Sequence, residues 1–169
     1  NTKEIKRMSE KKKVALIELN PYHGECLYSQ LRYLKSDAYD VTLFCNKSHE
    51  ATISSFDIVA DRSFFWDMKS FGNLLKIRRY LIDNRVETVI LNTIQGGRVL
   101  KFTLLPFPSW MKFVGTLHNI KKLNGSFGQK LICRKIQRIY LLAEYLKDSF
   151  ARYSKIPCVS YNSSYVPKY

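Results

Sequence analysis

Two polar residues, His118 and Asn119, directly follow an apolar run that extends from Met111 to Leu117. A run of this length without polar alternation is typical of a strand that is buried on both faces of a sheet. Ligands of open parallel sheets bind at the carboxyl ends of the strands, so we expect both residues at the rim of a binding crevice. A neutral imidazole there can donate and accept a hydrogen bond, which suits a hydroxyl group or a phosphate. The alternative is that His118 only caps the strand by bonding a loop carbonyl.

Two further loops carry polar residues that could join the same crevice. The first follows the apolar run Val14–Leu19 and contains Asn20, His23, Gly24 and Glu25. The second follows a run that begins at Thr88 and contains Asn92, Thr93, Gln95, Gly96, Gly97 and Arg98.

The polar residues of each of these two loops can be interpreted in two ways. Gln95–Arg98 stands just before an expected helix, whose free N–H groups and dipole favour an anion, but an ordinary flexible turn explains the same residues equally well. His23 and Glu25 could form an acid–base pair. Glu25 could equally place a favourable negative charge in the first turn of its helix.

The elements that must position these loops alternate along the chain. The expected strands are Val14–Leu19, Val41–Cys45, Phe56–Ala60, Thr88–Asn92, Phe113–Leu117, Arg138–Ala143 and Pro157–Tyr161. The expected helices are Cys26–Ser36, Asn73–Asn84, a helix from about Val99 that ends before Pro106, Gln129–Gln137 and Glu144–Tyr153. Strands that alternate with single helices, without hairpin signals, predict an α/β fold with a mostly parallel sheet covered on both faces. Right-handed crossovers then place the outgoing loops on one edge of this Rossmann-like three-layer sandwich.

Positive charge is concentrated in one part of the chain. The formal net charge is +14, and the segment 88–143 contains no Asp or Glu. Its basic residues are Arg98, Lys101, Lys112, Lys121, Lys122, Lys130, Arg134, Lys135 and Arg138. The same segment contains Phe102, Phe107 and Trp110, which suit a membrane interface, stacking on nucleic acid, or simple core packing. We therefore expect an anionic partner.

Several functional classes find no support in the sequence. The dinucleotide fingerprint, the P-loop, the HExxH motif and the serine nucleophile elbow do not occur. The four cysteines form no CxxC pair and show no zinc spacing, so we expect no metal site and no bound cofactor. Cys45 and Cys158 lie in apolar runs, which suits buried thiols in a reducing compartment. No signal peptide and no apolar run of about 18 residues is found, so we expect no membrane-spanning segment in these residues.

The order of these features resembles the N-terminal domain of GT-B glycosyltransferases, most closely the group similar to glycosyltransferase family 4. The likeness covers nearly the whole chain after a basic tail, residues 1–13, and makes residues 14–169 one Rossmann-like domain. It rests on the strand, polar loop and helix of Val14–Ser36, and on Thr116-Leu-His-Asn119 as a strand that ends in a histidine. Two more matches are Ile139–Lys147, a strand followed by a helix that starts at Glu144, and Pro157–Asn162, a strand that leads to an interdomain linker.

The resemblance implies the acceptor-binding half of a nucleotide-sugar-dependent glycosyltransferase that acts in polysaccharide or glycolipid assembly. A C-terminal domain outside this chain would bind most of the nucleotide-sugar donor, and we expect the chain to be a fragment that is inactive alone. His118 would position the reacting sugar, with Asn119, His23 and Gln95 along the same crevice. Glu144 would be a further substrate-binding residue. The acceptor would be a glycan or a lipid-linked molecule.

A cytoplasmic location follows from this interpretation, with peripheral contact to the inner face of a membrane. Lys121, Lys122, Lys130, Arg134 and Lys135 are the residues we expect to face an anionic lipid surface. The alternatives are a non-enzymatic module that binds nucleic acid, which we do not expect as a partner, or a nucleotide-sensing domain with a complete pocket of its own. A continuous basic stripe with exposed rings would favour nucleic acid.

Overall fold

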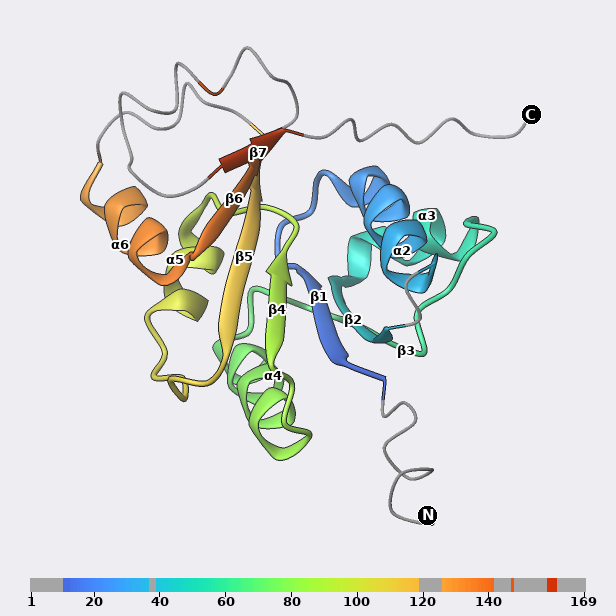
Figure 1. Cartoon of the computed structure of the whole chain (residues 1–169), viewed down its shortest axis with the longest axis horizontal. Helices are drawn as coiled ribbons and strands as arrows, with labels where there is room; N and C mark the ends of the chain where they lie inside the picture. The colour runs from blue at the N-terminus through green and yellow to red at the C-terminus, as the bar shows by residue number, and fades with distance from the viewer. Residues whose placement is uncertain (1–10, 37–38, 119–125, 142–146, 148–157, 161–169) are drawn as a thin grey trace, which may run out of the picture.

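The computed structural model describes residues 11–36, 39–118, 126–141, 147 and 158–160. These residues form a seven-stranded, all-parallel sheet with the order β3-β2-β1-β4-β5-β6-β7. The strands are β1 (Lys13–Glu18), β2 (Asp40–Asn46), β3 (Arg62–Trp66), β4 (Thr88–Leu91), β5 (Lys112–Leu117), β6 (Arg138–Leu141) and β7 (Cys158–Ser160). The predicted α/β, Rossmann-like fold is confirmed (Figure 1).

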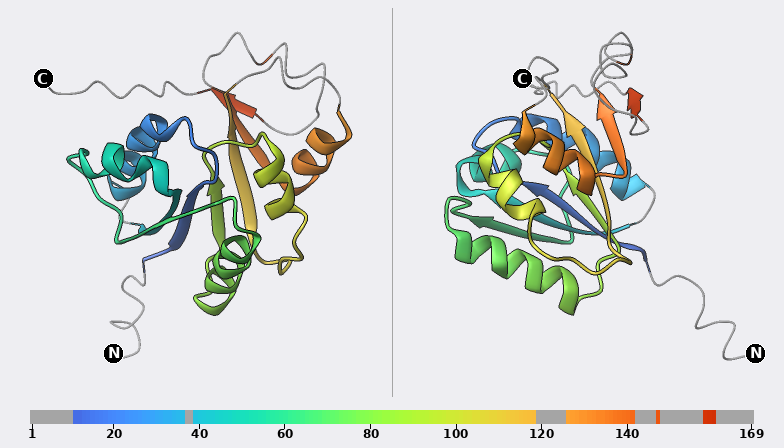
Figure 2. Two further views of the ribbon diagram at one scale, coloured as in Figure 1. Left: turned by 180° about the vertical axis from the view of Figure 1, so that it is seen from behind. Right: turned by 90° about the vertical axis from the view of Figure 1, so that its left-hand side faces the viewer.

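Helices cover both faces of the sheet. The α-helices are α2 (Leu27–Ser36), α3 (Glu50–Ser54), α4 (Phe71–Asp83), α5 (Gly97–Thr103) and α6 (Phe127–Lys135), and the short 3-10 helices are η1 (Gly24–Cys26) and η2 (Lys47–His49). Helices α2 and α3 lie on one face, and α4, α5 and α6 lie on the other (Figure 2). No helix among the described residues is long and apolar enough to cross a membrane.

The alternation of side chains along β1 divides the core into two layers. Ala15 and Ile17 pack in the layer under α4, α5 and α6, whereas Val14 and Leu16 pack in the layer under α2. All four side chains are at most 3% exposed, and each large apolar side chain buried in this way contributes about 1.5–3 kcal/mol. The next residue on the α2 side is Glu18, which the pattern carries into the core at the end of the strand.

The third strand was predicted in the wrong place. Phe56–Ala60 is not a strand; the strand is Arg62–Trp66, and η2 and α3, which were not predicted, precede it. The apolar segment serves a different purpose, because Phe56 is 7% exposed and packs edge-on against Tyr28 of α2. The true strand is at the edge of the sheet and is only half-buried, so it lacks the apolar signal of an inner strand.

The other predicted elements are present with shifted ends. The largest shifts, of two residues at the helix start, are at α4, which begins at Phe71, at α5, which begins at Gly97, and at α6, which covers Phe127–Lys135 instead of Gln129–Gln137. The predicted helix Glu144–Tyr153 lies outside the described residues apart from Lys147, and most of the predicted tail also lies outside them.

Candidate functional site

The site lies where the strand order reverses, between β1 and β4. The chain leaves β1 toward β2 on one side and leaves β4 toward β5 on the other, so the loops that follow the two strands diverge. Open α/β sheets bind their ligands at the carboxyl edge of such a reversal. The loops after β1, β4 and β5 meet at this edge, as predicted for one crevice.

A buried glutamate, Glu18, is the centre of a polar network at this edge. It is 0% exposed. Its Oε2 accepts hydrogen bonds from Asn92 Nδ2 and Thr93 Oγ1, both at 2.6 Å, and its Oε1 accepts one from the backbone N–H of Asn20 at 2.8 Å. The carboxyl end of β1 is thus tied to the loop after β4 through one side chain.

Burial and hydrogen bonding act on Glu18 in opposite directions. Removal from water raises its pKa from 4.5 to about 7, against the hydrogen bonds from Thr93, Asn20 and Asn92, which lower the pKa. Burial prevails because an uncompensated carboxylate is costly in a medium of low dielectric constant. Near neutral pH Glu18 can therefore hold or release a proton, as a general acid or base must.

The buried histidine His49 fixes the shape of the loop after β1. Its Nε2 lies 2.7 Å from the carbonyl oxygen of Asn20 and donates the proton to it, since a carbonyl can only accept. Gly24 packs on the ring of His49, and a Cβ at position 24 would overlap His49 Nδ1. Only glycine fits there, so this close approach holds the loop that carries His23.

His118 is oriented by the loop after β4. Its Nε2 donates a hydrogen bond to the carbonyl oxygen of Asn92 at 2.6 Å. This is the contact expected if His118 caps the strand by bonding a loop carbonyl. Its Nδ1, left without a proton, lies 3.9 Å from Cys26 Sγ. Chiefly through burial, and in smaller part through the nearby His23, the pKa of His118 falls from 6.5 to about 4 against the opposing effect of the hydrogen bond to Asn92, so the imidazole is neutral at physiological pH.

His23 covers the ring of His118. The two imidazoles are stacked, with centroids 4.1 Å apart and planes within 2° of parallel. His23 has a φ of 66°, a left-handed conformation that is uncommon for a residue with a side chain. Asn92 Nδ2 stabilises this conformation by donating to the carbonyl oxygen of His23 at 2.9 Å. The predicted pair of His23 and Glu25 is a loose contact, with Nδ1 and Oε1 3.8 Å apart, and Glu25 is exposed.

The loop at Gln95–Arg98 is folded onto the end of β1. Gln95 is buried, and its carbonyl oxygen accepts from Asn20 Nδ2 at 3.0 Å. Gly96 has a φ of 97°, which disfavours any residue with a Cβ, and it precedes α5. Arg98 donates to the carbonyl oxygen of Leu19 at 3.0 Å, so part of its guanidinium is used within the fold.

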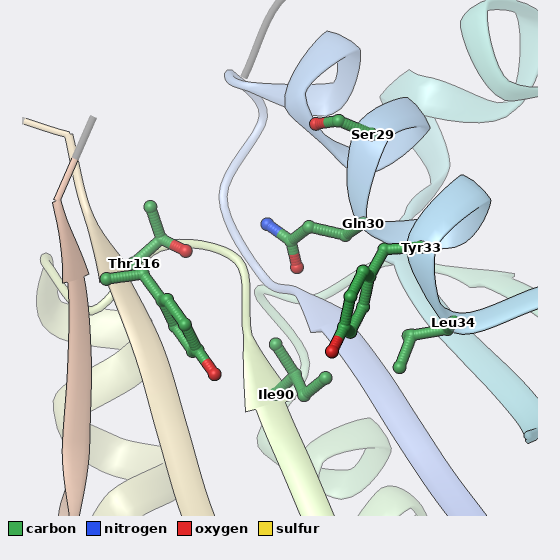
Figure 3. Close-up of a pocket in the computed structure, with 7 residues that line it drawn as sticks. Ser29, Gln30, Tyr33, Leu34, Ile90 and Thr116 are labelled. Atoms are coloured by element: carbon green, nitrogen blue, oxygen red, sulfur yellow. The ribbon is translucent and has the colours of Figure 1, made fainter. Parts of the chain in front are cut away.

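A pocket of about 430 Å³ opens beside this network, between α2 and strands β4, β5 and β6 (Figure 3). Its lining residues are Ser29, Gln30, Tyr33, Leu34, Ile90, Thr116 and Tyr140. Gln30 joins the pocket to the polar edge, because its Nε2 donates to Asn92 Oδ1 at 2.6 Å. The volume and the mixture of aromatic, amide and hydroxyl groups are those of a small-molecule site.

The residues predicted for the site fall into three groups. The structure brings together Asn20, His23, Gly24, Asn92, Thr93, Gln95, Gly96, Arg98 and His118 at one edge, with Glu25 at its exposed rim. Asn119, Glu144, Lys121 and Lys122 lie outside the described residues. Lys130, Arg134 and Lys135 are on α6, which packs on the face of the sheet opposite α2.

Sequence reasoning missed Glu18, Gln30, His49 and the contact of Cys26 with His118. Glu18 carried a usable signal, since it is the one charged residue in the run Val14–Leu19. The Cys26–His118 contact carried none, because the two residues are 92 positions apart.

A Rossmann-like sheet serves many unrelated functions, so the fold alone does not define an activity. No model of a known protein family matches the chain, and no curated protein matches it.

Proposed function

We propose that the chain is the acceptor-binding lobe of a nucleotide-sugar-dependent glycosyltransferase of the GT-B architecture, which acts in polysaccharide or glycolipid assembly. The observation that carries the proposal is the joined site at the strand reversal, where a pocket of about 430 Å³ meets the Glu18 network. The order of motifs that resembles this family supports the same conclusion. A C-terminal domain outside this chain would complete the site and bind the nucleotide-sugar donor.

The chemistry of the site suits a ligand rich in hydroxyl groups. His118 is neutral at physiological pH, and Glu18 has a pKa near 7, so neither of these two side chains places a full fixed charge at the edge. Tyr33 and Tyr140 offer rings with hydroxyl tips, and Gln30 offers an amide. Such groups can both donate and accept hydrogen bonds, as a sugar hydroxyl requires.

Three aromatic residues of the basic segment, Phe102, Phe107 and Trp110, do not support the rival function, binding of nucleic acid. Phe102 is 0% exposed, and Phe107 packs edge-on against both Phe102 and Phe113. Trp110 packs against the core, and Arg85 lies over its ring, 5.5 Å from the centroid. Rings used in this way are not platforms for stacking bases.

The expected contact with anionic lipid has a candidate surface on α6. Phe127 is 74% exposed, and Lys130 and Arg134 follow it at positions three and seven residues later, on the same face of the helix. An exposed ring beside basic side chains is suited to a lipid interface. Sedimentation with anionic and neutral vesicles tests this part. We expect salt-sensitive binding to anionic vesicles that Phe127→Ala weakens; equal pelleting on neutral vesicles would contradict it.

The main experiment uses the full-length protein with a panel of nucleotide sugars and with glycan and lipid-linked acceptors. We expect Tyr33→Ala to raise KM for the acceptor without a change in melting temperature, because the Tyr33 side chain lines the pocket but is 66% exposed. Lys76→Ala, an exposed change on α4, is the matched control. Sugar transfer by the 169 residues alone, or no transfer by the full-length protein with any donor, would contradict the proposal.

A further inference from the structure

Three side chains with nitrogen or sulfur ligand atoms gather at the rim of the site. They are His23, Cys26 and His118, and one ligand atom from each lies within 4.8 Å of the other two. They come from the loop after β1, the end of η1 and the end of β5. The Glu18 network does not use these ligand atoms, so the cluster is a separate chemical feature of the same edge.

The hydrogen bonds around the cluster prepare His118 for a metal. Its Nε2–H donates to the carbonyl oxygen of Asn92, which leaves a lone pair on Nδ1, the atom that faces Cys26 Sγ. Histidines that bind metals almost always donate their other ring N–H to a carbonyl or carboxylate in this way. Asn92 also holds the backbone of His23, a second member of the cluster, because its side chain donates to the carbonyl oxygen of His23.

The spacing is close to that of a tetrahedral site. Zinc bonds of about 2.3 Å to sulfur and about 2.0 Å to nitrogen, at a tetrahedral angle, place the two ligand atoms about 3.5 Å apart. Cys26 Sγ and His118 Nδ1 are 3.9 Å apart, so a shift of a few tenths of an ångström brings them to the right distance. The ring of His23 is stacked parallel to that of His118 and has to rotate, which its 36% exposed side chain permits.

We propose that His23, Cys26 and His118 form a binding site for a thiolate-preferring divalent metal, for which zinc is the natural occupant. One thiolate and two imidazoles are ligands that zinc favours, whereas magnesium and calcium require oxygen. Three protein ligands leave a fourth position, which in open zinc sites holds water or an oxygen atom of a substrate. This inference does not depend on the proposed transferase activity.

The test is a titration of the metal-free 169-residue chain with Co²⁺ under reducing conditions at neutral pH. We expect one equivalent to bind and to produce a thiolate-to-cobalt charge-transfer band that one equivalent of Zn²⁺ removes. Zn²⁺ should also raise the melting temperature, because it binds the folded chain.

Two variants and one control locate the site. Cys26→Ser should abolish the charge-transfer band, and His23→Ala should weaken Zn²⁺ binding at least about tenfold, the least that loss of an outer-shell partner costs. Cys133→Ser is the matched control, a part-buried cysteine on α6 that should leave the band unchanged. No stoichiometric binding by the wild-type chain, or a charge-transfer band that survives in Cys26→Ser, would overturn the proposal.

Discussion

Replacing Glu18 with Gln should turn a flat dependence of stability on pH into a steep one. The folded chain raises the pKa of Glu18 from 4.5 to about 7 and lowers that of His118 from 6.5 to about 4, in both cases chiefly by burial. Between pH 4.5 and 6.5 the folded chain therefore holds a proton on Glu18 and none on His118. The unfolded chain holds a proton on His118 and none on Glu18, so the two states bind the same number of protons.

The two contributions have opposite signs. The one from Glu18 is fully present below pH 4.5 and is lost as the pH rises to about 7. The one from His118 is fully present above pH 6.5 and is lost as the pH falls to about 4. Each changes the free energy of unfolding by about 1.4 kcal/mol per pH unit in the shared window, so they cancel there.

In Glu18→Gln only the contribution of His118 remains. We expect the free energy of unfolding to fall by about 3 kcal/mol in total as the pH is lowered from 6.5 to 4.5. His118→Gln should show a slope of the opposite sign, with stability falling as the pH rises. The absolute stability of either variant also changes through its lost hydrogen bonds, but the slope is independent of that offset.

The assay is unfolding in urea, followed by tryptophan fluorescence, at several pH values with EDTA to keep His118 free of metal. Glu50→Gln, an exposed carboxylate on α3, is the control and should reproduce the flat wild-type profile. A flat profile for Glu18→Gln would refute the reasoning, because it would mean that folding does not lower the pKa of His118. A wild-type profile as steep as that of Glu18→Gln would refute it too, because the three hydrogen-bond donors would then keep Glu18 ionised throughout.

Two further predictions concern packing. Gly24→Ala should destabilise the fold by about 1–3 kcal/mol, because the added methyl group overlaps His49. Gly97→Ala is the control and should be tolerated, because nothing lies within 4 Å of a Cβ at that position. Thermal unfolding of the two variants compares them directly. Lys135→Ala should lower the free energy of unfolding by about 0.5–1 kcal/mol, because the Lys135 ammonium lies 5.1 Å from the centroid of the Phe107 ring in a cation–π contact. An equal loss in Lys130→Ala would show that the loss of a positive charge, and not this contact, is responsible.

The sequence predicts the fold well because its inner strands carry a strong local signal. The runs at Val14–Leu19 and Phe113–Leu117 are buried on both faces, so their composition alone marks them as strands. The strand Arg62–Trp66 is at the edge and half-buried, so its composition does not separate it from the apolar loop before it. A contact such as Phe56 on Tyr28 is a tertiary feature that no local pattern contains.

The candidate site was predicted only in part for a related reason. The loops that meet at the strand reversal follow from topology, so Asn92 and His118 could be placed at one edge in advance. The partners of each side chain could not, because they depend on atomic positions. Glu18 is the clearest case: a lone glutamate in an apolar strand indicates something unusual, but not which donors it meets.

The Glu18 network also has a consequence for how the chain folds. Asn92 and Thr93 follow Glu18 by 74 and 75 residues, so during synthesis the glutamate emerges long before its partners. Contacts between such distant positions form late, because a long loop must first be closed. Until β4 docks on β1, the carboxylate stays hydrated and charged. Between pH 4.5 and about 7 it takes up its proton only at that moment. The joining of the two halves of the sheet is then a protonation event that a pH-indicator dye can time in a stopped-flow refolding experiment on His118→Gln, in which no histidine at position 118 releases a proton to cancel it.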